Sequence, residues 1–168
     1  MREGYPAWIA LNIRRAERED IPAMAALAAR LVRGHHAVDP LRFMLPDEVE
    51  RGYRVWFEQE HRRASVVMRV AEGDGGALVG YTYARLEDRD WNSLLDAFGA
   101  LHDLYVDENF RGAGIGEALV RATLDLLRTL GAPRCVLQTM WGNAVAQRLF
   151  ERVGFRRTMV EMTCELAP

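Results

Sequence analysis

The sequence predicts one α/β domain with a mixed central sheet. Short apolar runs with strand-like alternation are interspersed with longer runs at helical spacing. The second half contains β-α-β units, and such units place their strands parallel. The chain has 168 residues, 49% of them hydrophobic, and shows no repeat, low-complexity tract or linker. These observations indicate a single domain, residues 1–168, with one core.

The first half of the chain is expected to form a strand, two helices and a β-hairpin. The strand is indicated by the alternation of Ile9, Leu11 and Ile13. A helix follows from Asp20, a favoured N-cap residue, to Gly34, a favoured helix stop. A loop with two prolines leads to a second helix over residues 47–63. The hairpin spans residues 65–87, with the turn sequence GDGG between its strands.

The second half is expected to alternate strands and helices. The elements are an insertion at 88–99, a strand at 100–106, a helix at 117–131, a strand at 134–140, a helix at 143–154 and a closing strand at 155–166. The longer helix has apolar residues at helical spacing and Gly131 as its stop. The complete order is therefore β-α-α-β-β-β-α-β-α-β.

Composition and charge exclude several classes of partner. The net charge is -2, and the basic residues are scattered, so neither nucleic acid nor an anionic membrane surface is expected as a partner. No apolar run approaches the ~20 residues of a transmembrane helix, and the first residues do not resemble a signal peptide. Cys135 and Cys164 lie in apolar, strand-like surroundings and are expected to be buried, reduced thiols. A cytoplasmic protein is expected.

Three glycines at alternate positions, Gly112, Gly114 and Gly116, precede the helix at 117–131. A helix N-terminus attracts anions through its free N–H groups and its dipole, and glycine lets the backbone approach a ligand. Taken alone, the glycines fit a phosphate cradle and a tight strand-to-helix connection about equally. A nucleotide P-loop is excluded because no Lys follows, and the dinucleotide fingerprint fails at Glu117.

Two spaced motifs nevertheless point to one family. The stretch from Arg111 to Gly116 fits R/Q-x-x-G-x-G/A, and residues 143–155, NAVAQRLFERVGF, are close to N-x-x-A-x-x-L-Y-x-x-x-G-F. The chain thereby resembles the GCN5-related N-acetyltransferase (GNAT) superfamily, whose element order it also fits. The resemblance implies acetyl-CoA as co-substrate. It also implies an acceptor that is a primary amine of a small molecule or protein, which attacks the thioester directly. No metal is expected, because no Cys or third acidic residue stands at ligand spacing near His35, His36 and Asp39.

The resemblance also implies positions for acetyl-CoA. Backbone groups of the strand before the glycines should bond the pantetheine arm, as in strand addition; these belong to Leu104, Tyr105 and Val106. The pyrophosphate should rest on the glycine-rich turn, which comprises Arg111, Gly112, Ala113, Gly114, Ile115, Gly116 and Glu117. Asn143 should bond the pantetheine arm, with a plain helix cap as the alternative.

The catalytic residues depart from the family pattern. Phe150 stands where the family usually has a tyrosine acid, and Gln138 stands where some members have a glutamate base. Tyr105 is a candidate substitute acid, although packing is the more common role of a strand tyrosine. Asp103 is a candidate base, directly or through water, with a surface charge or a strand-edge hydrogen bond as the equal alternative. These departures keep open a second interpretation, a non-catalytic acyl-CoA-binding or sensor domain of the same fold.

The acceptor side and the oligomeric state depend on three segments. His35, His36 and Asp39 lie in the loop that usually lines the acceptor site, with surface histidines as the default interpretation. The insertion before the fourth strand is acidic and carries Trp91. It is expected either to attract a cationic acceptor or, slightly favoured, to present an interface helix with Leu94, Leu95 and Phe98. A single closing strand leaves a sheet edge exposed, which favours a homodimer.

Overall fold

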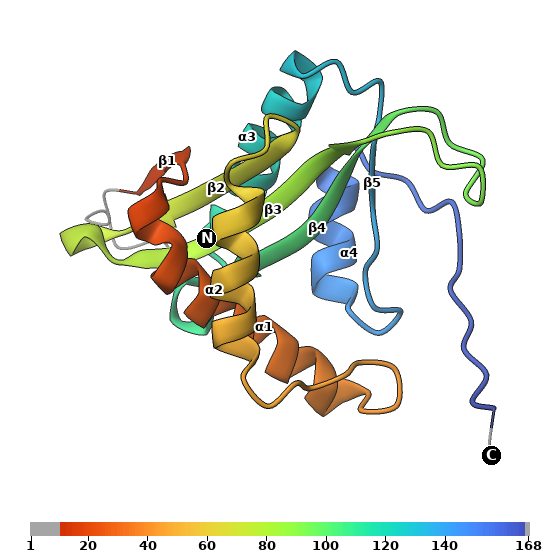
Figure 1. Ribbon diagram of the computed structural model, residues 1–168, viewed down its shortest axis with the longest axis horizontal. Coiled ribbons are helices and arrows are strands. Elements are labelled where there is room, and N and C mark those ends of the chain that lie inside the picture. The colour runs from red at the N-terminus through yellow and green to blue at the C-terminus, as the bar shows by residue number, and fades with distance from the viewer. Residues whose placement is uncertain (1–10, 167–168) are drawn as a thin grey trace, which may run out of the picture.

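The computed structural model describes residues 11–166. Its sheet has five strands in the order β1-β2-β3-β4-β5, drawn in Figure 1. The strands are β1 (Asn12–Arg15), β2 (Val66–Glu72), β3 (Leu78–Glu87), β4 (Phe98–Val106) and β5 (Cys135–Leu137). Pairing is antiparallel from β1 to β4, whereas β5 runs parallel to β4. Ile9 of the expected first strand lies outside the described residues.

Helices cover both faces of the sheet. They are α1 (Ile21–Val38), α2 (Val49–Glu60), α3 (Ile115–Thr129) and α4 (Ala144–Arg152). Short 3-10 turns stand at Arg18–Asp20, Asp74–Gly76 and Glu108–Phe110. In Figure 1, α1 and α2 lie in front of the sheet and α3 and α4 behind it. The front core contains Phe57 and Tyr81, and the rear cores contain Leu119 and Leu127. The predicted α/β fold with a mixed sheet is confirmed.

The first helix does not stop at Gly34. It continues through His35 and His36 to Val38, so the two histidines are helical and not part of a loop. Gly34 is absent from the glycines with positive φ among the described residues. The stop is set by Pro40 instead, because the residue before a proline is driven out of the helical region, and Asp39 has φ -148° and ψ 89°.

Two further segments differ from the expectation. The insertion before β4 forms the end of a long β3–β4 hairpin, closed by reciprocal backbone hydrogen bonds between Asp90 and Leu95. No interface helix forms there, and Leu94 is exposed in the left-handed region with φ 52°. The expected closing strand is likewise not formed. Residues 155–166 have no regular secondary structure, and Cys164 is exposed, where a buried thiol was expected.

The other cysteine fits the expectation better. Cys135 is half-buried in β5, and burial raises the pKa of its thiol to about 11. Among residues 11–166, no helix combines the length and the apolarity needed to cross a membrane.

Candidate active site

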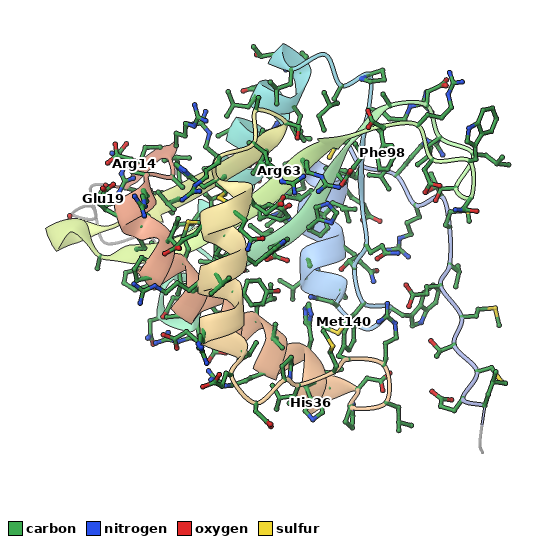
Figure 2. The ribbon with its side chains drawn as sticks, viewed as in Figure 1. Arg14, Glu19, His36, Arg63, Phe98 and Met140 are labelled. Atoms are coloured by element: carbon green, nitrogen blue, oxygen red, sulfur yellow. The ribbon has the colours of Figure 1, made fainter. Side chains whose placement is uncertain are left out.

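The site is organised by the separation of β4 from β5. Their parallel register covers only three pairs, from Gly99 with Cys135 to Leu101 with Leu137. Beyond these pairs the two strands run apart toward the end of the molecule where Met140 lies, while Phe98 marks the paired end (Figure 2). The last residues of β4 therefore have one edge that is not paired with β5.

The register identifies which backbone groups face that edge. The N–H of Asp107 donates to the carbonyl of Val79 at 2.8 Å. Hydrogen-bonded pairs alternate along an antiparallel ladder, so Tyr105 also directs its backbone groups at β3. The carbonyl of Tyr105 lies 2.8 Å from where a Cβ on Gly80 would stand, in agreement. Leu104 and Val106 consequently present their backbone groups to the open edge, as strand addition by pantetheine requires. For Tyr105 only the side chain is left to contribute.

A bulge interrupts β4 just before this edge. Tyr83 pairs with Asp103 and Ala84 pairs with Leu101, so the register skips His102. Such bulges redirect side chains and are common beside active sites. The bulge adds one residue to β4. Odd-numbered residues of β4 therefore direct their backbone groups at β5 before the bulge and at β3 after it.

Asp103 is the most perturbed carboxyl group at the site. It is half-buried, and its Oδ2 accepts a hydrogen bond from the Tyr81 hydroxyl at 3.0 Å. Burial raises the pKa of Asp103 to about 6, although the Tyr81 hydrogen bond and the nearby His102 act in the opposite direction. A carboxylate with a pKa near the working pH is suited to act as a general base.

Tyrosines on two elements enclose this carboxyl group. Tyr81 belongs to β3 and is fully buried, whereas Tyr53 belongs to α2 and packs against the same core. Burial and the charge of Asp103 raise the pKa of both phenols, so both hold their protons at neutral pH. The sequence patterns did not reveal these two tyrosines, because only the pairing of β3 with β4 and the docking of α2 bring them to Asp103.

The glycine-rich turn has the expected backbone conformation. Gly112 and Gly114 have φ of 81° and 74°, and α3 begins at Ile115 directly after them. A Cβ on either glycine would have no neighbour within 4 Å, so the conformation, not crowding, requires glycine there. Gly116 differs, because its Cβ would stand 2.9 Å from Leu149 Cδ1. Gly116 thus serves the close approach of α3 to α4.

The charged residues of the turn are partly engaged. Arg111 donates from Nε to the Val106 carbonyl at 3.0 Å, and its guanidinium lies 5.6 Å from the centre of the Tyr105 ring. Tyr105 is buried beneath it, which agrees with the packing role. Glu117 pairs with Arg121 at 2.8 Å and with Arg152 at 3.4 Å, and these hydrogen bonds lower the pKa of the Glu117 carboxyl.

The second motif forms α4 and its cap. The side chain of Asn143 accepts a hydrogen bond from the Ala146 N–H at 3.1 Å, which is the helix-cap role considered as the alternative. Phe150 is buried, with its ring 5.8 Å from that of Phe155. Gln138 donates to Glu161 at 3.4 Å. The structure therefore provides no acid or base at these last two positions.

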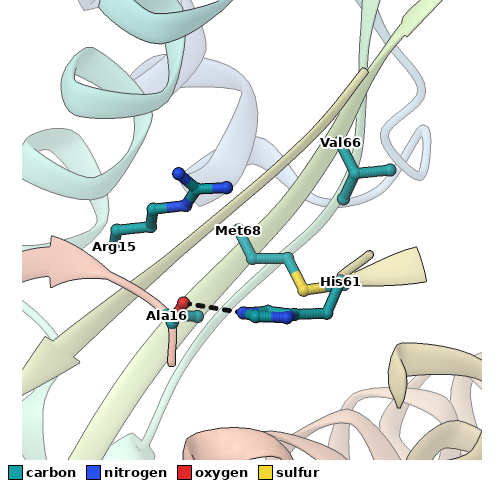
Figure 3. Close-up of a pocket in the computed structure, with 5 residues that line it drawn as sticks. All are labelled: Arg15, Ala16, His61, Val66 and Met68. Atoms are coloured by element: carbon teal, nitrogen blue, oxygen red, sulfur yellow. Dashed lines mark hydrogen bonds between the residues drawn. The ribbon is translucent and has the colours of Figure 1, made fainter. Parts of the chain in front are cut away.

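The histidines outside β4 serve local structure. His36 contacts the Phe43 carbonyl through Nδ1 at 2.7 Å, and the His35 ring lies 5.0 Å from that of Phe43. In a small pocket beside β2, the ring of His61 hydrogen-bonds to the Ala16 carbonyl at 3.1 Å (Figure 3). Within residues 11–166, no three of the His, Cys, Asp and Glu side chains gather as metal ligands would.

Comparisons with known proteins agree with this geometry. The profile of the acetyltransferase (GNAT) family matches residues 35–155. A mycothiol acetyltransferase from Beutenbergia cavernae is 30% identical over 149 residues, which cover 89% of this chain. The match covers 40% of that relative, so the chain spans well under half of the relative's length.

Solved structures share the fold. An aminoglycoside N-acetyltransferase in complex with CoA superposes with a TM-score of 0.77 and 18% identity, covering 96% of this chain and 98% of that one. A mutant protein from Bacillus halodurans superposes with a TM-score of 0.79 and 19% identity, covering 93% and 99%. At these identities the superpositions establish the common architecture.

Proposed function

Because the chain belongs to the acetyltransferase (GNAT) family, we propose that it transfers an acetyl group from acetyl-CoA to a primary amine of a small molecule or protein. The amine attacks the thioester directly. The observation that carries the proposal is the Asp103 carboxyl group, held by Tyr81 next to the β4 bulge, with a pKa of about 6. At neutral pH most of this group is carboxylate, which can accept a proton from the amine as it attacks the thioester.

Two features of the chain suit acetyl-CoA as the co-substrate. The open edge of β4 offers the backbone groups of Leu104 and the N–H of Val106 to an extended pantetheine arm, whereas the Val106 carbonyl accepts a hydrogen bond from Arg111. The turn at Gly112 and Gly114 leads into the N-terminus of α3, where N–H groups and the helix dipole favour a pyrophosphate. We propose that Arg111 and the rest of the turn, from Ala113 to Glu117, also surround the pyrophosphate. We propose that Asn143, which also caps α4, bonds the pantetheine arm and that Phe150 lies beside the same arm.

The departing thiolate does not require the missing tyrosine. A thiol has an ordinary pKa near 8.5, so its thiolate is a tolerable leaving group at neutral pH. Phe150 therefore does not argue against catalysis. Tyr105 remains a candidate acid, although its burial under Arg111 supports a packing role more strongly.

The non-catalytic sensor is the second candidate, and Phe150 and Gln138 are what favour it. Release of free CoA thiol from acetyl-CoA separates the two. The acceptors to be assayed are polyamines, amino acids, peptides, aminoglycosides and compounds related to mycothiol, the last two suggested by the names of relatives and structural neighbours. Thiol release that depends on one acceptor class supports the enzyme. Tight binding of acetyl-CoA without release for any acceptor supports the sensor.

We also propose that the protein is a cytoplasmic homodimer. The free state of both cysteines in the described chain is compatible with a reducing compartment. Residues 158–166 alternate in character, with Val160, Met162, Cys164 and Leu166 on one side. The three largest of these are 64–90% exposed in the single protomer. An amphipathic strand sequence without a sheet beside it is a pairing site for a second copy.

A further inference from the structure

The bulge in β4 places two neighbouring titratable side chains on one face of the sheet. In a regular strand, consecutive side chains point to opposite faces. Here Asp103 accepts a hydrogen bond from Tyr81, and the ring of His102 stacks on Tyr83 with 5.4 Å between centroids. Tyr81 and Tyr83 are two residues apart in β3 and share the face covered by α1 and α2. His102 and Asp103 therefore both lie on that face.

His102 is held at one nitrogen and accessible at the surface. Its Nε2 lies 3.3 Å from Glu87 Oε1, and 44% of the side chain is exposed. Glu87 accepts a hydrogen bond from Arg85 at 2.9 Å. Burial opposes its ionisation, but Arg85 and His102 lower the pKa of Glu87 overall. Glu87 is therefore a carboxylate at neutral pH and can accept a hydrogen bond from the His102 ring.

The surroundings of the two groups differ in their access to water. Asp103 is enclosed by the phenols of Tyr81 and Tyr53, which keep their protons and cannot accept another. Tyr83, on which His102 stacks, is itself tied to the interior, because its hydroxyl donates a hydrogen bond to the buried Glu60 at 2.6 Å. Among the titratable groups whose charge acts on Asp103 in the described chain, which are Tyr53, Tyr81 and His102, only His102 has a large exposed fraction. Imidazole is also the side chain type suited to exchanging protons with water near neutral pH.

We propose that His102 is a catalytic proton carrier, which takes the proton that Asp103 receives from the acceptor amine and passes it through water to bulk solvent. The inference rests on the proposed acetyl transfer. In each turnover the amine loses a proton to the Asp103 carboxylate, and the new C–N bond forms as the C–S bond of the thioester breaks. Asp103 then gives the proton to neutral His102, and the imidazolium, paired with Glu87, releases it. The CoA thiolate recovers one proton from solvent, so the overall balance is closed.

The sharpest test replaces the imidazole by a ring that stacks but carries no proton. His102→Phe retains the contact with Tyr83, so a change in rate reports on proton transfer and not on packing. We expect kcat to fall by about tenfold or more, while the KM for acetyl-CoA stays within about twofold of the parent. The residual kcat should rise with buffer concentration, and free imidazole in the assay should restore part of the loss.

A remote histidine provides the matched control. His61 lies at the C-terminal end of α2, and His61→Gln keeps a side-chain donor for the Ala16 carbonyl (Figure 3). Its kcat should equal that of the parent and should not respond to imidazole.

The outcomes separate the two proposals. If the parent transfers acetyl groups and His102→Phe keeps its full kcat without buffer dependence, the proton-carrier role is wrong and the proposed function stands. A loss of kcat that imidazole does not restore also overturns the role. If the parent shows no acceptor-dependent thiol release with any amine, the proposed function itself fails, and the inference about His102 fails with it.

Discussion

At the scale of single residues, burial sets the pH at which the Asp103 carboxyl loses its proton. With a pKa of about 6, it is protonated in acid and charged above neutrality. We expect kcat/KM of the parent to fall as the pH decreases through about 6. Asp103→Asn should reduce kcat/KM by roughly 100-fold or more at pH 8 and should lack this acid limb. A pH–rate profile of the variant that overlays the parent's would remove Asp103 from the mechanism.

The same pKa makes a prediction about stability. The folded state holds the Asp103 proton to a higher pH than the unfolded chain, in which the carboxyl has its ordinary pKa of 3.8. The free energy of unfolding therefore falls as the pH rises from about 4 to about 6, and the cost persists above that window. Asp103→Asn should stabilise the protein by about 1–2 kcal/mol at pH 8, allowing for partial exposure.

Urea unfolding at pH 8 and at about pH 4 measures this effect. The stabilisation should largely disappear at the lower pH, where the Asp103 carboxyl is neutral in the folded parent and only partly ionised in the unfolded parent. Asp125→Asn, an exposed carboxyl on α3 paired with Arg128, is the control and should not gain stability at pH 8. An Asp103→Asn variant that is less stable than the parent at pH 8 would show that burial does not penalise the charge.

At the scale of elements, Gly34 and Gly114 both have open space around them but differ in backbone conformation. A Cβ added to either Gly34 or Gly114 would meet no atom within 4 Å, but only Gly114 has a positive φ, 74°. Gly34→Ala should therefore stabilise α1 by about 0.5–1 kcal/mol. Gly114→Ala should destabilise the protein by about 1–2 kcal/mol and weaken acetyl-CoA binding in calorimetry. A loss of stability in Gly34→Ala would mean that the helix does end there.

The elements also show how far the sequence alone can lead. Helix and strand periodicity, the GDGG turn and the two motifs predict every α-helix and β-strand from β1 to α4, because these signals are local. The stop of α1 was misplaced, since the constraint of Pro40 on Asp39 outweighed the preference of Gly34. The site was only half predictable. Its strand position makes Asp103 a candidate, but Tyr81 and Tyr53 reach it through tertiary contacts that no local pattern encodes.

At the scale of the whole molecule, the two halves of the chain meet at β4. The first half supplies Tyr53 and Tyr81 around Asp103, and the second half supplies the glycine-rich turn and α4. The segment after Phe155 leaves this body and runs apart from the sheet (Figure 1). An ion pair between Glu161 and Arg42, together with the contact to Gln138, ties it to the rest.

The apolar side chains of that segment predict association. Val160 and Met162 are 64% and 90% exposed, so charging them costs the single protomer little, whereas it would expel them from an interface between two strands. Light scattering at micromolar concentration should find the parent as a dimer and Val160→Glu/Met162→Glu as a monomer with unchanged thermal stability of the protomer. Met44→Glu, which charges an equally exposed methionine in the loop before α2, should remain a dimer. A monomeric parent at high micromolar concentration would contradict the homodimer, and equal loss of association in Met44→Glu would place the interface elsewhere.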